Sequence, residues 1–164
     1  MRCKLLMVAF VAATLTVAGQ VATAPPAQAR AIEVSASTEL RIRTAVKKYA
    51  AIQVAQREPY CYGGTGPNCF DCSGLVVAAY RYAGINLPAR GVRTSTQMRG
   101  WTTAISLGQV HSGDLLFYSG HVEMVYRSSS GRMVAVSATH TGGPPVNFHS
   151  IRRTGLLKVG QVVT

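Results

Sequence analysis

One segment restricts the fold of this chain more than any other. Residues 71 to 84 form a predicted helix that is apolar or small on nearly every side. Asp71 is a residue type that caps helix N-termini, and Gly84 is well placed as the C-terminal stop. The apolar positions at helical spacing are Leu75, Val76, Ala79, Tyr80 and Ala83. A helix of this composition has to be buried, so the rest of the chain must cover it.

A second, amphipathic helix is predicted before it. Ser37 can cap this helix, Glu39 lies in its first turn, and the helix ends before Pro59. Its apolar face consists of Ile42, Ala45, Val46, Tyr49 and Ile52. Residues 59 to 70 are rich in Gly, Pro and Asn, so we expect a loop there.

The second half of the chain has the pattern of an antiparallel sheet. We expect residues 88 to 104 to form a long surface loop, because they are polar and basic. Short apolar runs separated by turn residues follow, and they predict strands at 115 to 118, 122 to 127, 133 to 137, 146 to 151 and 156 to 163. Helices first and a meander second make the predicted fold class α+β.

The first 29 residues have the order of a secretory signal. Arg2 and Lys4 precede an apolar run from residue 5 to 18, and small residues ending in Ala29 follow. We expect cleavage before Arg30, which also removes Cys3. No later segment approaches the roughly 20 apolar residues of a membrane-spanning helix. The sequence therefore predicts a protein that is secreted, or associated with a cell wall.

The remaining chain is strongly basic. Without Arg2 and Lys4 it holds 15 basic and 6 acidic residues. A cationic exported protein is attracted to polyanions, and outside a cell these include anionic wall polymers. The basic residues are scattered and show neither an aromatic-interleaved stripe nor zinc-finger spacing, so nothing besides charge points to nucleic acid. The alternative interpretation of the same charge is a solvated surface that keeps the protein soluble.

Three cysteines remain after the leader, and only two of them can pair. Cys61 and Cys69 flank a turn-forming stretch that can bring their Cα atoms within bridging distance. That pairing leaves Cys72 as a free thiol. In the first turn of the predicted helix, unpaired N–H groups and the helix dipole favour a thiolate, which is the nucleophilic form of cysteine. The alternative is that Cys72 is a buried small hydrophobe.

A cysteine nucleophile needs a base within hydrogen-bond reach. Four histidines are available: His111, His121, His140 and His149. His121 stands at the start of an apolar strand and follows Gly120, which leaves space beside the ring. We therefore expect His121 to be the base, against the alternative of a structural histidine.

A third residue should orient the imidazole, and the next strand is its natural source. A hairpin folded about Ser129 places Ser137 opposite His121, whereas a fold one residue earlier places Ala135 there. His140 lies three residues beyond Ser137. The three alternatives stay open on the residues alone, with Ser137 as the candidate.

The sequence also resembles a known family. The stretches that carry the resemblance are Pro59-Tyr60-Cys61-Tyr62-Gly63-Gly64, Phe70-Asp71-Cys72-Ser73-Gly74-Leu75, Arg93-Thr94-Ser95 with Gln97, Gly113-Asp114-Leu115-Leu116-Phe117, Gly120-His121-Val122 and His140-Thr141-Gly142. Their content and order are similar to those of the NlpC-type cell-wall cysteine endopeptidases over nearly all of residues 42 to 155.

This resemblance implies a papain-like α+β domain, assigned to residues 42 to 164 after a lead-in at 30 to 41, that acts as a monomer. It implies hydrolysis of an amide bond in the peptidoglycan stem, commonly between D-glutamate and a diamino acid, through a thioester and without cofactor or metal. Cys72 matches the nucleophile and His121 the base. Tyr62, Asp71 and Ser73 match positions that line the substrate cleft.

Two departures from the family pattern bear on activity. Ser137 stands at the third catalytic position, where most members have histidine, and Glu123 replaces a small residue two positions after His121. The alternative function is therefore a weakly active or inactive module that binds wall peptide. A zinc site is disfavoured, because the Cys and His residues lack paired-ligand spacing.

Overall fold

The computed structural model describes residues 32 to 164. The predicted signal segment, residues 1 to 29, lies outside them. The helices are α1 (Ala36–Gln56), α2 (Cys72–Tyr82) and α3 (Ser95–Trp101), with 3-10 turns η1 (Pro88–Arg90) and η2 (Leu107–Gln109). The strands are β1 (Thr103–Ala104), β2 (Leu115–Tyr118), β3 (His121–Arg127), β4 (Met133–Ser137), β5 (Asn147–His149) and β6 (Lys158–Gln161). None of the helices in this part of the chain is long and apolar enough to cross a membrane.

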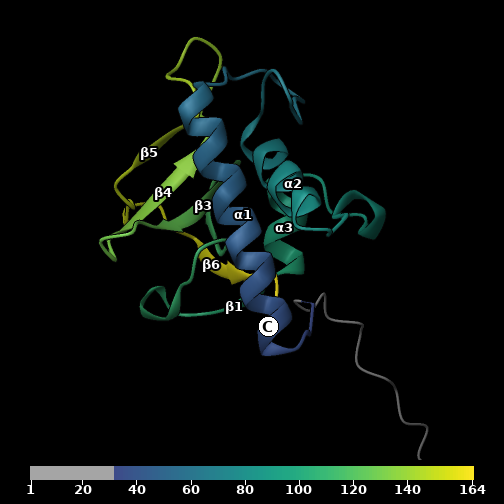
Figure 1. Ribbon diagram of the computed structural model, residues 1–164. Helices are drawn as coiled ribbons and strands as arrows, with labels where there is room; N and C mark the ends of the chain where they lie inside the picture. Colours follow the sequence, from purple (N-terminus) through teal and green to yellow (C-terminus); the bar gives the residue numbers. More distant parts are fainter. Residues whose placement is uncertain (1–31) are drawn as a thin grey trace, which may run out of the picture.

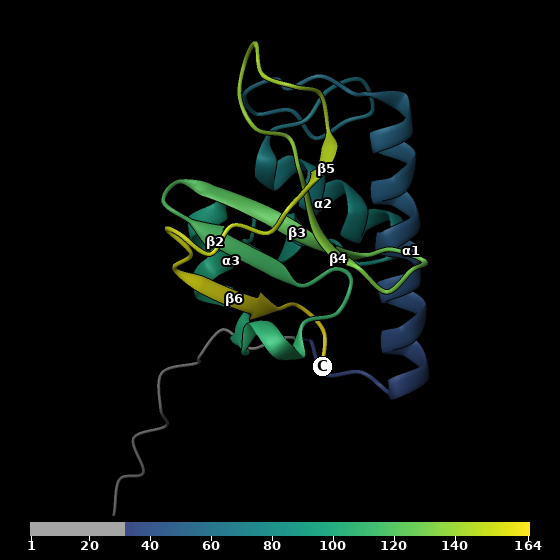
Figure 2. The same ribbon diagram turned by 90° about the vertical axis from the view of Figure 1, so that its left-hand side faces the viewer.

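The strands form one antiparallel sheet in the order β1-β6-β2-β3-β4-β5. The two long helices pack side by side, and α2 also contacts β3. In Figure 1, α1 stands in front with the sheet on its left and α2 and α3 on its right, and in the turned view of Figure 2, α2 and α3 lie behind the sheet and α1 at its right-hand edge. The predicted α+β class is therefore confirmed.

Alternate residues of the central strands enter two apolar clusters. Phe117, Val122 and Met124 belong to the large cluster that includes the apolar residues of α1 and α2. Leu116 and Val125 belong to a smaller cluster with residues of the loops around the sheet. This alternation follows from the two-residue period of a strand, and it explains why β2 is buried at every position.

The predicted helix at 71 to 84 is confirmed as the centre of the core. Asp71 caps α2 by accepting a hydrogen bond from the backbone N–H of Gly74. Ala83 is the C-cap of the helix, and Gly84 follows with φ of +89°. Residues 73 to 80 are all buried. The helix is therefore held on all sides, as its composition requires.

The predicted N-cap of α1 is wrong by two residues. Ser35, and not Ser37, accepts the hydrogen bond from Thr38 N–H at 3.4 Å, so Ser37 lies inside the helix. The helix ends at Arg57, whose left-handed φ of 56° lets its N–H reach the carbonyls of Gln53 and Val54. Serines two residues apart compete for the cap, and composition alone does not choose between them.

The predicted surface loop at 88 to 104 is also wrong, because it contains η1, α3 and β1. Helix α3 begins with a capping box. Thr94 Oγ1 accepts from the backbone N–H of Gln97 at 3.2 Å, and the Gln97 side chain accepts from Thr94 N–H at 2.9 Å. These reciprocal bonds stabilise a seven-residue helix that has little apolar periodicity.

The β3–β4 register differs from the predicted one. Met124 pairs with Val136, so the hairpin folds about Ser130 and extension of the register places Ser137 opposite Glu123, not His121. The reason is a wider turn. Ser128 N–H donates to the Arg132 carbonyl at 2.8 Å, and Arg132 N–H donates to Ser128 Oγ at 3.0 Å.

The last two strands are shorter than predicted. β5 covers 147 to 149 of the predicted 146 to 151, and β6 covers 158 to 161 of the predicted 156 to 163. The flanking residues instead bond to other segments: Val146 N–H donates to Glu58 O and Leu157 N–H to Phe117 O, both at 2.8 Å.

A buried ion pair joins α1 to the start of β2. Arg43 Nη1 donates to Asp114 Oδ1 at 2.8 Å, and the Asp114 side chain is completely buried. The same guanidinium donates to the carbonyls of Ser112 and Val163 at 3.2 Å. Its Nε donates to Glu39 at 2.6 Å. Arg43 thus fixes α1 against the sheet through four separate acceptors.

We predict that Asp114→Asn lowers the free energy of unfolding by about 3 kcal/mol, because it leaves the buried Arg43 charge without a counter-charge. Urea unfolding measures this as a lower midpoint with an unchanged slope. Glu39→Gln is the matched control. It removes the partly exposed partner of the same guanidinium and should cost below about 1 kcal/mol. Equal midpoints for Asp114→Asn and the parent would contradict this account of the anchor.

Candidate active site

The loop before α2 is closed by a disulfide. Cys61 and Cys69 are bridged with their Cα atoms 5.6 Å apart, which confirms the predicted pairing. Within the loop, Gly66 N–H donates to the Cys69 carbonyl at 2.8 Å. Gly64 O accepts from Asp71 N–H at 2.9 Å. A Cβ at Gly74 would overlap that Gly64 carbonyl, so glycine is required where the loop crosses the helix start.

Cys72 is the first residue of α2 and the free cysteine of the described residues. Burial raises the pKa of its thiol. The hydrogen bond with His121 and the bond from the Val122 backbone N–H outweigh burial, so the pKa is lowered from its ordinary value. The helix start favours the anion further. The local environment therefore stabilises a thiolate.

His121 is the first residue of β3 and pairs with Tyr118 across a two-residue hairpin turn. Gly120 occupies that turn with φ of +67°. Burial opposes the charged imidazole, but the Cys72 thiol and the Glu123 carboxylate outweigh burial and raise the pKa of His121 to about 9. The Cys72 pKa is lowered and the His121 pKa is raised, so each side chain favours the charged form of the other.

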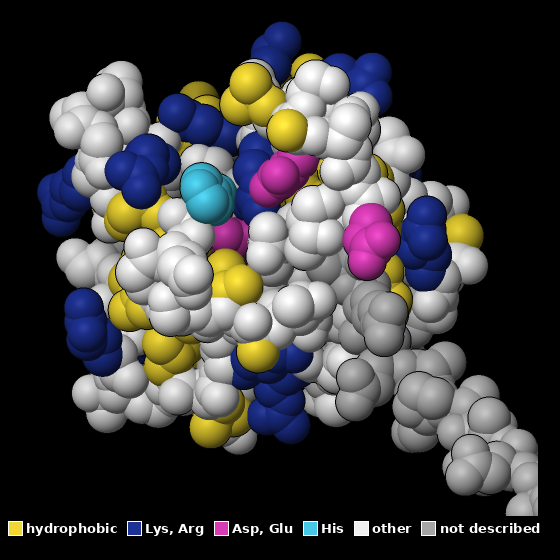
Figure 3. Space-filling view, turned by 90° about the horizontal axis from the view of Figure 1, so that it is seen from below, with side chains coloured by type: hydrophobic (Ala, Val, Ile, Leu, Met, Phe, Trp, Pro, Cys, Tyr) yellow, Lys and Arg dark blue, Asp and Glu magenta, His cyan; other side chains and the backbone are white. Residues whose placement is uncertain are grey.

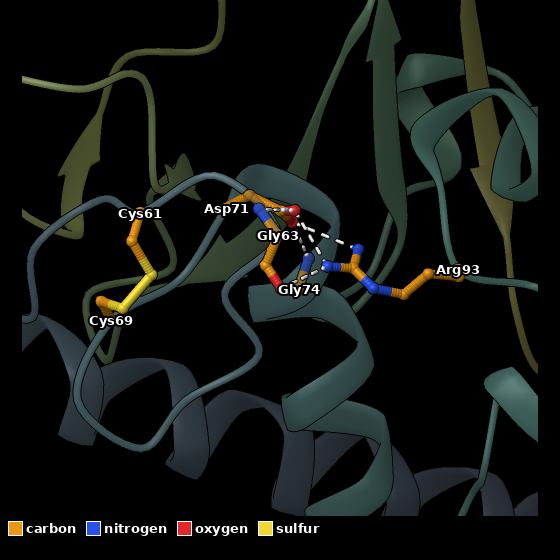
Figure 4. The surroundings of a disulfide bond; sticks show 6 residues. All are labelled: Cys61, Gly63, Cys69, Asp71, Gly74 and Arg93. Atoms are coloured by element: carbon orange, nitrogen blue, oxygen red, sulfur yellow. Dashed lines mark hydrogen bonds and ion pairs between the residues drawn. A yellow bond between two sulfur atoms is a disulfide. The ribbon is translucent and has the colours of Figure 1, made fainter.

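Asp71 and Ser73, two of the predicted substrate-binding residues, belong to a hydrogen-bonded cluster around Arg93. Arg93 Nη2 donates to Asp71 Oδ2 at 2.9 Å, and its Nη1 donates to Ser73 Oγ at 2.8 Å. Ser73 Oγ donates to Asp71 Oδ1 at 3.0 Å, and Gly63 N–H donates to Asp71 Oδ2 at 3.1 Å. Figure 4 shows Arg93 and the disulfide on opposite sides of Asp71.

This cluster keeps Asp71 ionised. Burial raises the pKa of Asp71, but the Arg93 guanidinium and the Gly74 N–H outweigh burial and hold the pKa below its usual range. Tyr62, the third predicted substrate-binding residue, is 93% exposed on the same loop. Arg93 was part of the recognised sequence pattern, but its contact with Asp71 joins residues 22 positions apart and had no local signal.

Ser137 lies near the site without bonding to His121. Its buried hydroxyl is 3.2 Å from His149 Nε2. The other candidates for the third position are placed differently. Ala135 pairs with Val125 and lies next to His149 in the sheet. His140 lines the groove beside Cys72. No hydrogen bond or ion pair recorded in residues 32 to 164 joins Ser137 or His140 to His121.

Glu123 is the acidic residue that sequence reasoning did not assign to the site. Its Oε1 lies 3.6 Å from His121 Nε2, 3.8 Å from His149 Nε2 and 3.0 Å from an Arg152 nitrogen. Burial raises its pKa, but His121, His149 and Arg152 outweigh burial and lower it. The two-residue period of a strand puts residues 121 and 123 on one face, and that was the signal available in the sequence.

A groove of about 770 Å³ makes the pair accessible. Its polar lining includes Cys72, His121, Glu123, His149 and Arg152. A thiol at a helix start and an imidazole thus meet at one concave surface, an arrangement that is suited to cysteine hydrolysis.

The comparisons with known proteins agree with this class. The model of the NlpC/P60 family matches residues 57 to 147, and the chain belongs to that family. The resemblance predicted from the sequence is therefore confirmed. A "Probable endopeptidase" of Corynebacterium glutamicum is 32% identical over 132 residues, which cover 78% of this chain and 59% of the relative. The chain thus spans less than two thirds of that relative's length.

Two solved structures support the papain-like fold. The peptidoglycan hydrolase RipB of Mycobacterium tuberculosis superposes with a TM-score of 0.65 at 22% identity, covering 80% of this chain and 69% of that chain. RipD of Mycobacterium tuberculosis superposes with a TM-score of 0.58 at 25% identity, covering 74% of this chain and 97% of that one. RipD is described as a non-catalytic NlpC/p60 domain protein adapted to peptidoglycan binding.

We predict that Arg93→Gln shifts acid unfolding to higher pH. A depressed carboxyl pKa stabilises the fold above the unfolded value of about 4, and this contribution is lost as the pH falls through the folded value. Without Arg93 the pKa of Asp71 is less depressed, so we expect a loss of about 1 kcal/mol at pH 7 that shrinks toward pH 2. Circular dichroism during acid titration measures it.

Arg90→Gln is the control for this prediction, because it removes an equal charge from an exposed neighbouring position. It should unfold at the same pH as the parent. A pH of unfolding that shifts equally in both variants would attribute the effect to net charge and would contradict a role for the Asp71 contact.

Proposed function

We propose that this chain is an exported cysteine endopeptidase that hydrolyses an amide bond in the peptidoglycan stem, between D-glutamate and a diamino acid. The observation that carries the proposal is that Cys72, at the start of α2, and His121, at the start of β3, line one groove and interact there. Family membership gives the substrate class, because named relatives are peptidoglycan hydrolases and endopeptidases.

In the proposed acylation step, the Cys72 thiolate attacks the carbonyl carbon of the stem amide. The resulting oxyanion would be stabilised by backbone N–H groups at the start of α2, an effect typically worth about 3 kcal/mol. His121, present as imidazolium, then donates its proton to the leaving amine as the C–N bond breaks. The products are a thioester on Cys72 and a free amine.

In the proposed deacylation step, a water molecule enters the groove in place of the amine. His121, now neutral, takes one proton of this water while the oxygen attacks the thioester carbonyl. The C–S bond breaks and the carboxylic acid leaves. Cys72 is again a thiolate and His121 again an imidazolium, so the cycle closes without a cofactor.

Asp71, Ser73 and Tyr62 are proposed to bind substrate. The exposed Tyr62 ring offers a flat surface on the loop before α2. The Arg93–Asp71–Ser73 cluster, formed by the start of α2 and the segment before α3, offers charged and polar groups. A stem peptide carries both free amino and carboxyl groups, so such a cluster is chemically suited to one end of it.

Charge supports a wall environment for the proposed enzyme. Three of the six acidic residues, Asp71, Asp114 and Glu123, are buried. The accessible surface is therefore more cationic than the composition indicates, and we propose that it is drawn to anionic wall polymers. On the face drawn in Figure 3 the Lys and Arg side chains are spread apart and do not form one patch. Such a diffuse positive charge suits non-specific attraction to an anionic wall polymer better than specific recognition of a nucleic acid.

The second candidate function is peptidoglycan binding without cleavage. Two observations favour it: Ser137 does not bond to His121, and a structural neighbour, RipD, is described as non-catalytic. In this case the groove would hold wall peptide and the cationic surface would add salt-dependent affinity.

We predict that Cys72→Ala abolishes release of peptides from purified peptidoglycan, and that His121→Ala lowers the rate by about 1,000-fold or more. Ser137→Ala should cost less than about 10-fold, because its hydroxyl contacts His149 and not the base. Mass spectrometry of fragments from defined muropeptides measures the rates and identifies the bond.

The exposed Ser129→Ala is the matched control and should leave the rate unchanged. Digestion by Cys72→Ala at the parent's rate would refute the thioester mechanism. Sedimentation of the parent with wall, without peptide release at any protein concentration, would establish the binding function instead.

A further inference from the structure

Glu123 is a buried carboxylate in the middle of the central strand β3. Its side chain is 1% exposed, on a strand where the neighbouring residues are apolar. Burial of an ionised carboxylate costs several kcal/mol unless partners offset it. Arg152 is a partner, but its side chain is 61% exposed and needs no buried counter-charge of its own. The pairing with Arg152 alone therefore does not account for Glu123.

The location of Glu123 is informative, because it lies beside His121. The two residues are two positions apart on β3 and share a face of the strand. The carboxylate Oε1 is 3.6 Å from His121 Nε2, and Glu123 also lines the groove that contains Cys72.

The opposite side of Glu123 is fixed by the C-terminal part of the fold. Arg152 donates to Oε1 at 3.0 Å, and His149 Nε2 lies 3.8 Å from the same oxygen. The Arg152 guanidinium in turn lies over the Tyr118 ring, 4.9 Å from its centroid. Ser137 Oγ lies 3.2 Å from His149 Nε2. Arg152 and His149 therefore contact the same carboxylate oxygen as His121, whereas Glu123 Oε2 is buried without a hydrogen-bond partner.

We propose that Glu123 is the positioning residue for His121, and that it takes over from β3 the task that the adjacent strand would supply through residue 137. The inference rests on the proposed function, in which His121 acts on Cys72. Glu123 holds the ring with Nε2 toward itself and stabilises its protonated form. Arg152 and His149 support Glu123, and Ser137 supports His149.

This arrangement sets the pH behaviour of the site. The groups that face the His121–Glu123 pair are Cys72 from α2, Tyr118 from β2, His149 from β5 and Arg152 from the following loop. A negative Glu123 favours the imidazolium, so its neutralisation must lower the pKa of His121. The imidazolium donates the proton to the leaving amine, so activity on the alkaline side depends on that pKa.

Glu123→Gln tests this proposal while keeping the shape of the side chain. We expect kcat to fall by about 100-fold with little change in KM, and the alkaline limb of the kcat/KM profile to move down by about one pH unit or more. Glu123→Asp keeps the charge at a longer distance, so its alkaline limb should lie between those of Glu123→Gln and the parent. Stopped assays on a defined muropeptide across the pH range measure both effects.

Two control variants separate this role from general effects. Glu33→Gln removes the same charge from an exposed position and should leave the profile unchanged. Ser137→Ala removes the hydroxyl at the position that the family pattern assigns to catalysis, and its alkaline limb should stay with the parent. A limb that moves in Ser137→Ala but not in Glu123→Gln would overturn the proposal.

Histidine NMR titration of the folded chain gives a second readout that does not need activity. We expect the pKa of His121 to fall in Glu123→Gln. If the glutamine variant does not fold, Glu123→Asp replaces it in the test, and we expect a smaller fall of the same pKa. Titration curves that coincide with the parent's would overturn the proposal. A lower His121 pKa in a chain that releases no peptide from wall would uphold the positioning role of Glu123 and reject the proposed endopeptidase function.

Discussion

The pairing of a cysteine at the start of a helix with a histidine at the start of a strand is the interaction on which the rest of this site depends. It requires α2 and β3 to meet at fixed positions. Asp71 fixes the first turn of α2, and the hairpin turn at Gly120 fixes the start of β3. The buried contacts of α2 with β3 then hold the two starts together. Packing in the core thereby sets the separation of Cys72 and His121 in the groove.

Electrostatic interactions also affect the protonation of the Cys72–His121 pair. Cys72 and His121 are both partly buried, and burial alone would keep both side chains neutral. The interaction between the two side chains opposes burial, because it lowers the Cys72 pKa and raises the His121 pKa, and Glu123 also favours the imidazolium. In the proposed charge state, negative and positive groups alternate in space: the thiolate of Cys72, the imidazolium of His121, the carboxylate of Glu123 and the guanidinium of Arg152. Removal of His121 or Glu123 would leave the adjacent charged groups without a group of opposite charge beside them.

The sequence predicted those parts of the fold and site that depend on local patterns. The apolar helix at 71 to 84, its Asp71 cap and the turn that lets Cys61 reach Cys69 all follow from neighbouring residues. Helix α3 was missed because a capping box stabilises it, with little apolar period to reveal it. The partner of Ser137 across the strands was missed because the turn after Arg127 holds two more residues than predicted, which changes the register. The place of Glu123 was missed because its partners lie on β5 and beyond, 26 and 29 positions away.

The central claim is that the sulfur of Cys72 is ionised at neutral pH. Ultraviolet absorbance of the thiolate tests it directly in a chain that begins at Arg30, where the disulfide leaves one free thiol. The difference spectrum against Cys72→Ala should contain a thiolate band at pH 7, with a titration midpoint well below the ordinary value of about 8.5. A band that appears only above about pH 8.5, at the same midpoint when His121 is replaced by alanine, would contradict the account.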